Sequence, residues 1–343
     1  MMGWSKRNRL EAAIAGEPVD RPPVALWRHW PGDDQDAEAL AAAHLKWQAD
    51  YDWDVVKIGP ASSYSVVDWG VEDRWEGHIE GTRRTTHYPI TSPADWETLR
   101  PLDPTRGMLA TQIKALRLVG EGLRDGAPFL ATMFSPLSMA KHLAGNEVVL
   151  THLRHHPDSL RRGLETLTES ILRFIEAARP TGIAGIYYAV QHAAYPLLSR
   201  AEFDDFGRPY DLRVLESAAD LWCNMVHLHG SRVMFDRVAD YPMAFLNWHD
   251  RDTGISLADG LAQTQAAASG GVSQWTIHHE GPTGTHAEAA DARSQTGDRR
   301  LLLGTGCVIM TTTPLRNIRA LREAAESATP ARVVSFLPSV PQG

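Results

Sequence analysis

The 343 residues of this chain carry 34 basic and 42 acidic side chains, a formal net charge of −8 at pH 7. This charge argues against nucleic acid or an anionic membrane surface as a partner, because both attract basic proteins. Hydrophobic residues make up 43% of the chain, yet no apolar run approaches the roughly 20 residues that span a bilayer. The two cysteines, Cys223 and Cys307, exclude a disulfide framework. We therefore expect a soluble, cytoplasmic globular protein.

The first third of the chain begins with a helix that Ser5 can cap and Gly16 can end. The elements predicted here are, in order, a helix at 5–15, a strand at 24–27, a helix at about 36–50 and a strand at 53–60. An irregular segment over residues 61–104 follows, in which Gly81 begins a possible hairpin. A connection of this length inside a domain is typical of a lid or an active-site insertion.

The rest of the chain alternates between short apolar runs and segments with helical periodicity. The six further runs with the length of strands cover residues 128–134, 185–190, 224–229, 242–248, 271–277 and 300–304. Helices are predicted between most of them, including 108–123 and 208–219. A last helix opens at Pro314, a residue suited to the first helical turn.

Eight apolar strands, mostly separated by helices and without an internal linker, favour one α/β domain over residues 1–343. The count predicts a single (β/α)8 TIM barrel. The link between Gly230 and Pro242 leaves room for only a turn or two of helix. An open doubly wound sheet is therefore the alternative fold.

In a TIM barrel, active sites form at the carboxyl ends of the strands. Here these ends carry side chains that bind metals or transfer protons, whereas the strand bodies do not. The strand-end residues are Arg28, His29, Lys57, Ser135, Gln191, His192, His227, His229, His249, Asp250, His278, His279 and Cys307. This asymmetry predicts a functional site at that end of the barrel.

Two of these side chains, His227 and His229, lie on the same face of the fifth predicted strand. Together with Cys307 they form a donor set that suits Zn²⁺ and leaves one position open. Zinc would lower the pKa of a bound thiol or water, and Asp236 or Asp250 could fix a histidine tautomer. The alternative is two hydrogen-bonded histidines and a buried thiol.

Six further side chains complete the predicted site. Arg28 and Lys57, as cations at strand ends, could anchor a carboxylate on a small-molecule substrate; the alternative for both is an internal ion pair. Tyr64, in the loop after the second strand, and Gln191 are predicted to contact the substrate. His249 is predicted to move a proton, with Asp250 beside it among the catalytic residues.

Several stretches of the chain resemble the uroporphyrinogen decarboxylase superfamily over nearly the whole length. These stretches are Arg21-Pro22-Pro23-Val24 with Arg28, Gln191 with Leu198-Ser199, Phe203 and Pro209-Tyr210, His227-Leu228-His229-Gly230, and Thr313-Pro314 with Asn317-Ile318-Arg319. The resemblance implies a (β/α)8 barrel and one of two chemistries, and it makes a homodimer an expectation.

The decarboxylases of this superfamily act on a tetrapyrrole without metal. The resemblance implies that they use an R-x-x-x-R motif at the first strand and an aspartate after the second. Arg28 matches the first arginine, but Gly32 stands at the second and Lys57 at the aspartate position. Both departures count against porphyrinogen decarboxylation.

The other branch contains corrinoid-dependent methyltransferases in which zinc activates a thiol. The resemblance implies an H-x-C motif at the fifth strand and a cysteine after the eighth. His227 and Cys307 match the first and last of these ligands, whereas His229 stands in place of the middle cysteine. An imidazole there makes zinc a stronger Lewis acid and a bound thiolate a weaker nucleophile.

The sequence thus predicts a zinc-dependent methyltransferase or demethylase that acts on a small, carboxylated substrate. A corrinoid or a thiol coenzyme is expected as its methyl partner, and a corrinoid protein as its protein partner. The first alternative is a metal-free decarboxylase of a carboxylated ring compound, with Arg28 and Lys57 as its charged groups. The second is a barrel that binds a corrinoid or tetrapyrrole without catalysis.

Overall fold

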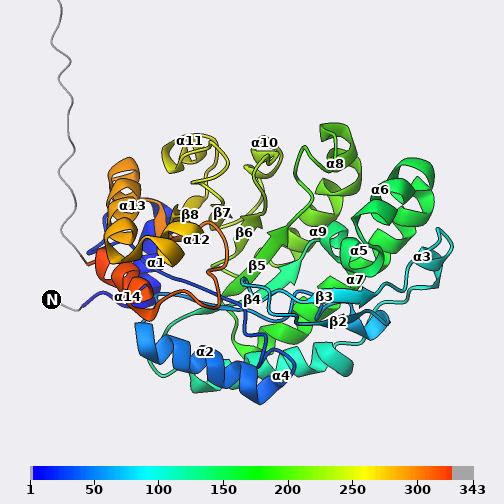
Figure 1. Cartoon of the computed structure of the whole chain (residues 1–343), viewed down its shortest axis with the longest axis horizontal. Coiled ribbons are helices and arrows are strands. Elements are labelled where there is room, and N and C mark those ends of the chain that lie inside the picture. The colour runs from blue at the N-terminus through cyan, green and yellow to red at the C-terminus, as the bar shows by residue number, and fades with distance from the viewer. Residues whose placement is uncertain (1–2, 327–343) are drawn as a thin grey trace, which may run out of the picture.

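The computed structural model describes residues 3–326, and its main feature is one curled parallel sheet with helices around the outside (Figure 1). Each strand pairs in parallel with the next one along the sheet. In order, the strands are β1 (Val56–Ile58), β4 (Phe129–Phe134), β5 (Gly185–Val190), β6 (Met225–Leu228), β7 (Phe245–Trp248), β8 (Ala267–Val272) and β9 (Leu301–Thr305). Parallel order with helical crossovers confirms a TIM-like α/β fold.

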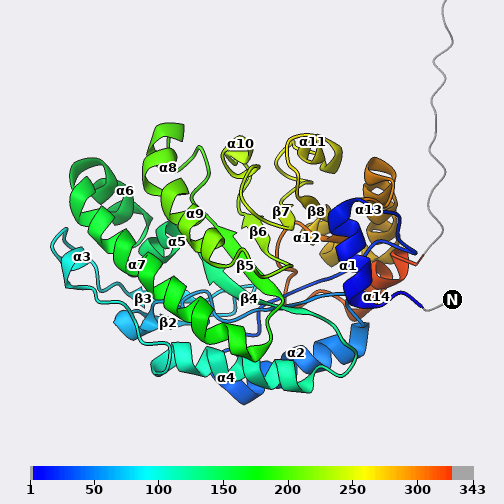
Figure 2. The same ribbon diagram turned by 180° about the vertical axis from the view of Figure 1, so that it is seen from behind.

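The helices cover the outer face of the sheet, and α2 and α4 lie side by side along one edge in both views (Figures 1 and 2). Their bounds are α1 (Lys6–Ala15), α2 (Ala37–Tyr51), α3 (Asp95–Thr98), α4 (Gly107–Gly122), α5 (Pro136–Ala144), α6 (Asn146–His155), α7 (Pro157–Ala178), α8 (Arg200–Phe206), α9 (Arg208–Ser217), α10 (Phe235–Val238), α11 (Leu257–Leu261), α12 (Gln274–His279), α13 (Gly281–Thr296) and α14 (Leu315–Ala324). The predicted first helix is confirmed, with Ser5 as its N-cap and Gly16 left-handed at its end. Within residues 3–326, no helix has the length and hydropathy that crossing a membrane requires.

The prediction of a strand at Val24–Trp27 is wrong, because this segment forms only one parallel bridge, between Val24 and Leu303. On its other side, the amide of Asp54 donates to the Val24 carbonyl at 2.9 Å. The Asp54 carboxylate in turn accepts the Val24 amide at 2.8 Å, which removes that donor from a strand ladder. Pro22 and Pro23 have no N–H to donate. The segment therefore lies between β9 and the residues before β1, and the sheet formed by residues 3–326 has seven strands rather than the eight predicted.

The seventh predicted strand, 271–277, is also wrong in its position. Strand β8 ends at Val272, and Ser273 caps the short helix α12, its hydroxyl accepting the Trp275 amide at 3.2 Å. His278 and His279 therefore lie at the end of a helix rather than of a strand. The true strand was missed because its alanine, serine and glycine residues are poor strand formers by propensity.

The predicted irregular insertion, 61–104, contains a small antiparallel pair of strands. Strand β2 (Glu72–Arg74) pairs with β3 (Arg84–His87), and the loop between them holds residues 75–83. The predicted domain of residues 1–343 extends beyond the described residues at both ends, at 1–2 and 327–343.

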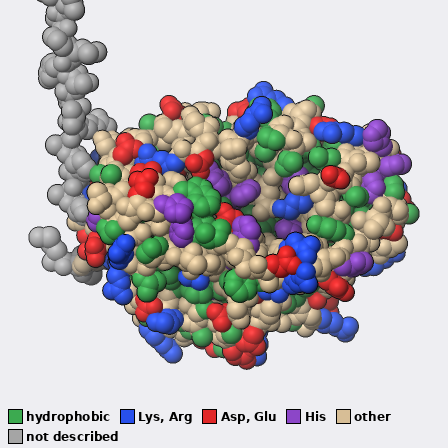
Figure 3. Space-filling view, in the orientation of Figure 1, with side chains coloured by type: hydrophobic (Ala, Val, Ile, Leu, Met, Phe, Trp, Pro, Cys, Tyr) green, Lys and Arg blue, Asp and Glu red, His purple; other side chains and the backbone are tan. Residues whose placement is uncertain are grey.

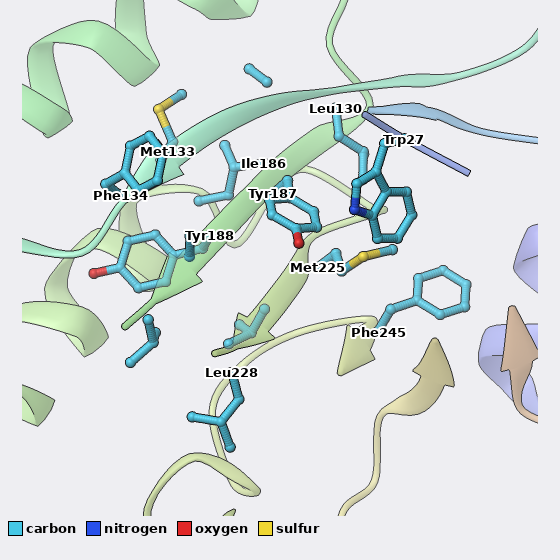
Figure 4. Packing of buried hydrophobic residues seen from close by; sticks show 14 of the residues in the cluster. Trp27, Leu130, Met133, Phe134, Ile186, Tyr187, Tyr188, Met225, Leu228 and Phe245 are labelled. Atoms are coloured by element: carbon cyan, nitrogen blue, oxygen red, sulfur yellow. The ribbon is translucent and has the colours of Figure 1, made fainter. Parts of the chain in front are cut away.

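The two faces of each strand have different neighbours, as Tyr187 and Tyr188 on β5 show (Figure 4). Tyr188 faces the outer helices, where its hydroxyl donates to Asp211 of α9 at 2.7 Å. Tyr187 points inward and packs edge-on against Trp27, with ring centroids 5.4 Å apart. Inward side chains such as Tyr187 therefore line the inside of the curled sheet, where the polar residues of the strand ends also gather.

Candidate metal centre

Four possible metal ligands converge at the carboxyl ends of three strands. His227 lies on β6 and His229 directly follows it, His249 follows β7, and Cys307 follows β9. One possible ligand atom from each of the four lies within 4.8 Å of every other. The structure thus brings together the three predicted ligands and adds His249, which the sequence reasoning assigned to proton transfer.

The distances within the cluster are short. His229 Nδ1 lies 3.4 Å from both His227 Nε2 and His249 Nε2. Cys307 Sγ lies 3.8 Å from His227 Nε2 and 3.8 Å from His229 Nδ1. All four donors therefore point toward one common centre.

Asn247 orients the most buried of these ligands. Its Oδ1 lies 2.6 Å from His227 Nδ1, and its Nδ2 donates to the carbonyls of Ser269 and Thr305 at 2.8 and 3.0 Å. Because both amide protons are used, Oδ1 must be the acceptor, so His227 carries its proton on Nδ1. The lone pair of Nε2 is then free and faces the cluster, which is the arrangement that metal ligation needs.

Burial keeps the histidines neutral. It lowers the pKa of His227 well below its usual value, and neighbouring His229 and His249 add to the effect. It likewise lowers the pKa of His229 to about 4. Burial also raises the pKa of the Cys307 thiol to about 12, so a cation at the centre would be needed to ionise it. Neutral imidazoles and an ionisable thiol form a coherent ligand set.

The cluster borders a cavity of about 300 Å³ that opens toward solvent. The face seen in Figure 3 is hollowed near its centre, with histidine and basic side chains around the hollow. The cavity has a cationic wall, formed by Lys57 of β1 and Lys141 of α5. Tyr187 and Phe134 add aromatic surface.

The two cavity lysines have no carboxylate partner among residues 3–326. Lys57 is 5% exposed, and its Nζ lies 4.8 Å from the centroid of the Tyr187 ring. Lys141 Nζ donates to Gln191 Oε1 at 2.7 Å. Burial lowers the pKa of each lysine to about 8. Because an unpaired buried charge is costly, two such cations beside a cavity give this wall the charge that could hold an anion.

Of the predicted substrate-binding residues, Lys57 and Gln191 line the cavity, but Arg28 and Tyr64 do not. The Arg28 guanidinium lies over the Trp30 ring at 4.7 Å, and its Nε donates to the His29 carbonyl at 3.3 Å. The Tyr64 hydroxyl is used within the core, donating to the Thr132 carbonyl at 2.6 Å. Neither side chain is placed to touch a ligand in this cavity.

The two acids predicted to support a histidine have other partners. Asp250 accepts the Gly271 amide at 3.1 Å, and Asp236 lies 2.8 Å from Arg200. Asn247 takes the supporting role at His227. At His249 the nearest acid is Asp252, with Oδ2 at 3.6 Å from Nδ1.

Sequence reasoning missed Asn247, Lys141 and Glu80, all of which contact the cluster or line the cavity. One signal was available for Asn247, a polar residue in an apolar strand two positions before His249 and thus on the same face. Lys141 and Glu80 come from a helix and from the insertion. A search confined to strand ends could not find them.

Comparison with known proteins finds relatives of two kinds. The methylcobamide:CoM methyltransferase MtbA of Methanosarcina mazei is 19% identical over 95% of this chain and 99% of that protein. A uroporphyrinogen decarboxylase of Prochlorococcus marinus is 23% identical over 70% of this chain and 69% of that protein.

The fold is shared with a solved methyltransferase from Methanosarcina mazei, which superposes with a TM-score of 0.83 at 22% identity and covers 94% of this chain and 99% of the other. The sequence model of the uroporphyrinogen decarboxylase (URO-D) family matches residues 5–328. Because that match spans nearly the whole chain, this protein belongs to the uroporphyrinogen decarboxylase family.

Proposed function

We propose that this protein is a zinc-dependent methyltransferase or demethylase acting on a small anionic substrate that carries a thiol or another heteroatom. One observation carries the proposal: three histidines and a cysteine present four donor atoms within 4.8 Å at the edge of the cavity. The methyltransferases among the relatives, which match nearly the full chain, support the same reaction class.

The donor set fits zinc in type and spacing. Zinc binds imidazole nitrogen at about 2.0–2.1 Å and thiolate sulfur at about 2.3 Å, so tetrahedral ligands lie about 3.4 Å apart for two nitrogens and about 3.6 Å apart for nitrogen and sulfur. The separations of 3.4 and 3.8 Å around His229 Nδ1 are close to these values. With three of the four donors as ligands, one position would stay open, and zinc held there would act as a Lewis acid that lowers the pKa of a thiol or of water.

The lysines of the cavity would bind and orient the substrate. Lys57 and Lys141 would hold its anionic group, since they are buried cations that pair with no carboxylate in the described part of the chain. Gln191 holds the Lys141 ammonium in place. The heteroatom of a small substrate would then lie toward His229 and Cys307, which line the same cavity.

We propose a methylcobamide as the methyl donor, presented by a corrinoid protein at the cavity opening. The basis is the methylcobamide:CoM methyltransferase among the relatives, which covers 95% of this chain. A thiol coenzyme is the corresponding acceptor.

The second candidate function is a metal-free decarboxylase of a carboxylated ring compound. The same two lysines favour it, because a buried ammonium can stabilise the charge that develops when CO₂ leaves. With Arg28 outside the cavity, Lys57 and Lys141 would be its charged groups. A barrel that binds a corrinoid or tetrapyrrole without catalysis is the non-enzymatic possibility.

The test is methyl transfer from methylcobalamin to 3-mercaptopropionate, followed by the change in cobalamin absorbance. We expect zinc-loaded protein to be active, metal-stripped protein to be inactive, and His229→Ala to lose activity. Lys46→Met is a matched control, because Lys46 is exposed and paired with Asp50. Release of CO₂ from aromatic carboxylates by metal-stripped protein would favour the decarboxylase, and binding of cobalamin without either reaction would favour the non-enzymatic barrel.

A further inference from the structure

The loop between β2 and β3 turns one acidic side chain into the cavity. Most of residues 75–79 face solvent, with Trp75 44% and Ile79 37% exposed. The next residue, Glu80, lines the cavity beside the cluster. Among the described residues that line this cavity, Glu80 is the only carboxylate.

The backbone around Glu80 is held in place on both sides. The Ile79 carbonyl accepts two hydrogen bonds from Thr311, at 2.8 Å from its amide and at 2.9 Å from its hydroxyl. Gly81 adopts φ +80°, and a Cβ there would lie 2.8 Å from His29 Cβ. These contacts fix the direction in which the loop presents the Glu80 side chain.

Within residues 3–326, the Glu80 carboxylate has one hydrogen-bond partner: Gln274 Nε2 donates to its Oε1 at 3.2 Å. The nearby Arg83 does not neutralise it, because that guanidinium pairs with Asp73 at 2.6 Å and with Asp34 at 3.3 Å. Glu80 lines the same cavity as His229 and Cys307 of the cluster. A negative charge at Glu80 would therefore oppose a thiolate bound in this cavity.

We propose that Glu80 accepts the proton that a substrate thiol loses on binding beside the cluster. This inference rests on the proposed function. The S–H bond breaks, its electron pair stays on sulfur, and the proton bonds to a carboxylate oxygen of Glu80. The negative charge thereby moves from carboxylate to sulfur, so the cavity keeps its net charge and the thiolate faces no second anion.

Other groups around the cavity are less suited to the role. The donor nitrogens of His227, His229 and His249 face one another across the cluster. Lys57 and Lys141 carry their protons at neutral pH. The two other histidines that line the cavity, His29 and His142, hold a proton poorly, because burial lowers the pKa of both well below the usual value. Among the described lining residues, Glu80 is the carboxylate that lies outside the cluster.

The test counts protons at pH 7 when 3-mercaptopropionate binds to zinc-loaded protein. Calorimetry in buffers of different ionisation enthalpy gives the protons released, and ultraviolet absorbance gives the thiolate formed. For the wild type we expect thiolate with almost no proton released. For Glu80→Gln we expect either about one proton released per thiolate or no thiolate at all.

Glu76→Gln is the matched control, because Glu76 lies on the same loop, is exposed and pairs with Arg74 and Arg84. It should behave as the wild type. Two results would overturn the role of Glu80 and leave the proposed function standing. The first is that the wild type releases one proton for each thiolate formed. The second is that Glu80→Gln forms thiolate without releasing a proton. Failure of the zinc-loaded wild type to bind the thiol would overturn the proposed function, and this inference with it.

A kinetic measurement separates proton transfer from a structural role. Loss of a general base costs about 10²–10⁴-fold in rate. We expect Glu80→Gln to lose at least about 10²-fold in kcat/KM with an alkanethiol and far less with an arenethiol that is already ionised at the assay pH. An equal loss with both thiols would contradict proton transfer.

Discussion

His227 Nδ1 lies 2.6 Å from Asn247 Oδ1, and the two residues stand side by side on β6 and β7. Asn247 in turn donates to carbonyls at β8 and β9, so its amide ties four neighbouring strands to the orientation of one imidazole. The hydrogen bonds of Asn247 to the sheet therefore fix the direction in which the Nε2 lone pair of His227 points.

The first prediction concerns this support. Asn247→Ala should weaken zinc binding about 10–100-fold, because His227 loses the partner that fixes its tautomer and ring orientation. Competition with a chromophoric chelator measures the affinity. Asn317→Ala is the control, since Asn317 is a buried asparagine that donates to the Ile277 carbonyl away from the cluster. Equal zinc affinity in the wild type and Asn247→Ala would contradict the supporting role.

The cavity lysines predict a pH dependence for anion binding. Burial lowers the pKa of Lys57 and of Lys141 to about 8, so both are charged at pH 7 and become neutral as the pH rises through 8. The affinity for propionate should fall by about tenfold per lysine between pH 7 and pH 9. Calorimetric titration measures it.

Variants of the same lysines supply the control for that dependence. Lys57→Met and Lys141→Met should each weaken propionate binding at pH 7 and flatten its pH dependence, whereas Lys46→Met should leave both unchanged. Binding that is independent of pH between 7 and 9 in the wild type would count against the anion site.

A buried acid on the outer face predicts how stability depends on pH. Burial raises the pKa of Asp211 to about 7, although hydroxyls of Tyr188 and Tyr241 donate to its carboxylate. A raised folded pKa means that the native state binds the proton more tightly. The protonated Asp211 therefore adds to the free energy of unfolding. The full contribution is present below the unfolded pKa of about 4, and it is lost as the pH rises through 7.

Asp211→Asn should remove this part of the pH dependence, which is on the order of a few kcal/mol between pH 4 and pH 7. Urea denaturation at several pH values gives the free energy of unfolding. If the difference in that free energy between wild type and variant is the same at pH 4.5 and pH 7.5, Asp211 does not titrate as described.

The short bridge at Val24 predicts a stability effect at Gly304. A Cβ on Gly304 would lie 2.6 Å from the Ala25 carbonyl oxygen, so alanine there must push the segment 23–25 away from β9. We expect Gly304→Ala to lower the free energy of unfolding by about 1–3 kcal/mol. Gly32→Ala, with no atom within 4 Å of its Cβ, should have almost no effect. If the wild type, Gly304→Ala and Gly32→Ala gave similar denaturation curves, close packing between segment 23–25 and β9 would be contradicted.

Much of the fold could be predicted because apolar runs mark buried parallel strands well. Strand β5 was predicted with its observed bounds, Gly185–Val190. Strand β8 was misplaced, because its Ala-Ala-Ser-Gly-Gly run resembles a loop in composition. Val24–Trp27 has the composition of a strand, but its Val24 amide donates to the carboxylate of Asp54. This hydrogen bond joins residues 30 positions apart, so the local sequence does not reveal it.

The candidate site was predictable where it follows strand ends and not where it comes from elsewhere. His227, His229 and Cys307 converge because neighbouring parallel strands end at the same edge of the sheet. Lys141 reaches the cavity from helix α5 and Glu80 from a loop whose position depends on Thr311, more than 200 residues away. No local pattern encodes such contacts.

The metal content of the purified protein tests the central claim most directly. Elemental analysis, before and after a chelator wash and reloading, should give about one zinc per chain. His227→Ala and Cys307→Ala should lose the metal while circular dichroism shows a folded protein. Full zinc retention in both variants would contradict the site, and a wild type that takes up no zinc when it is offered would contradict the proposed metal-dependent reaction.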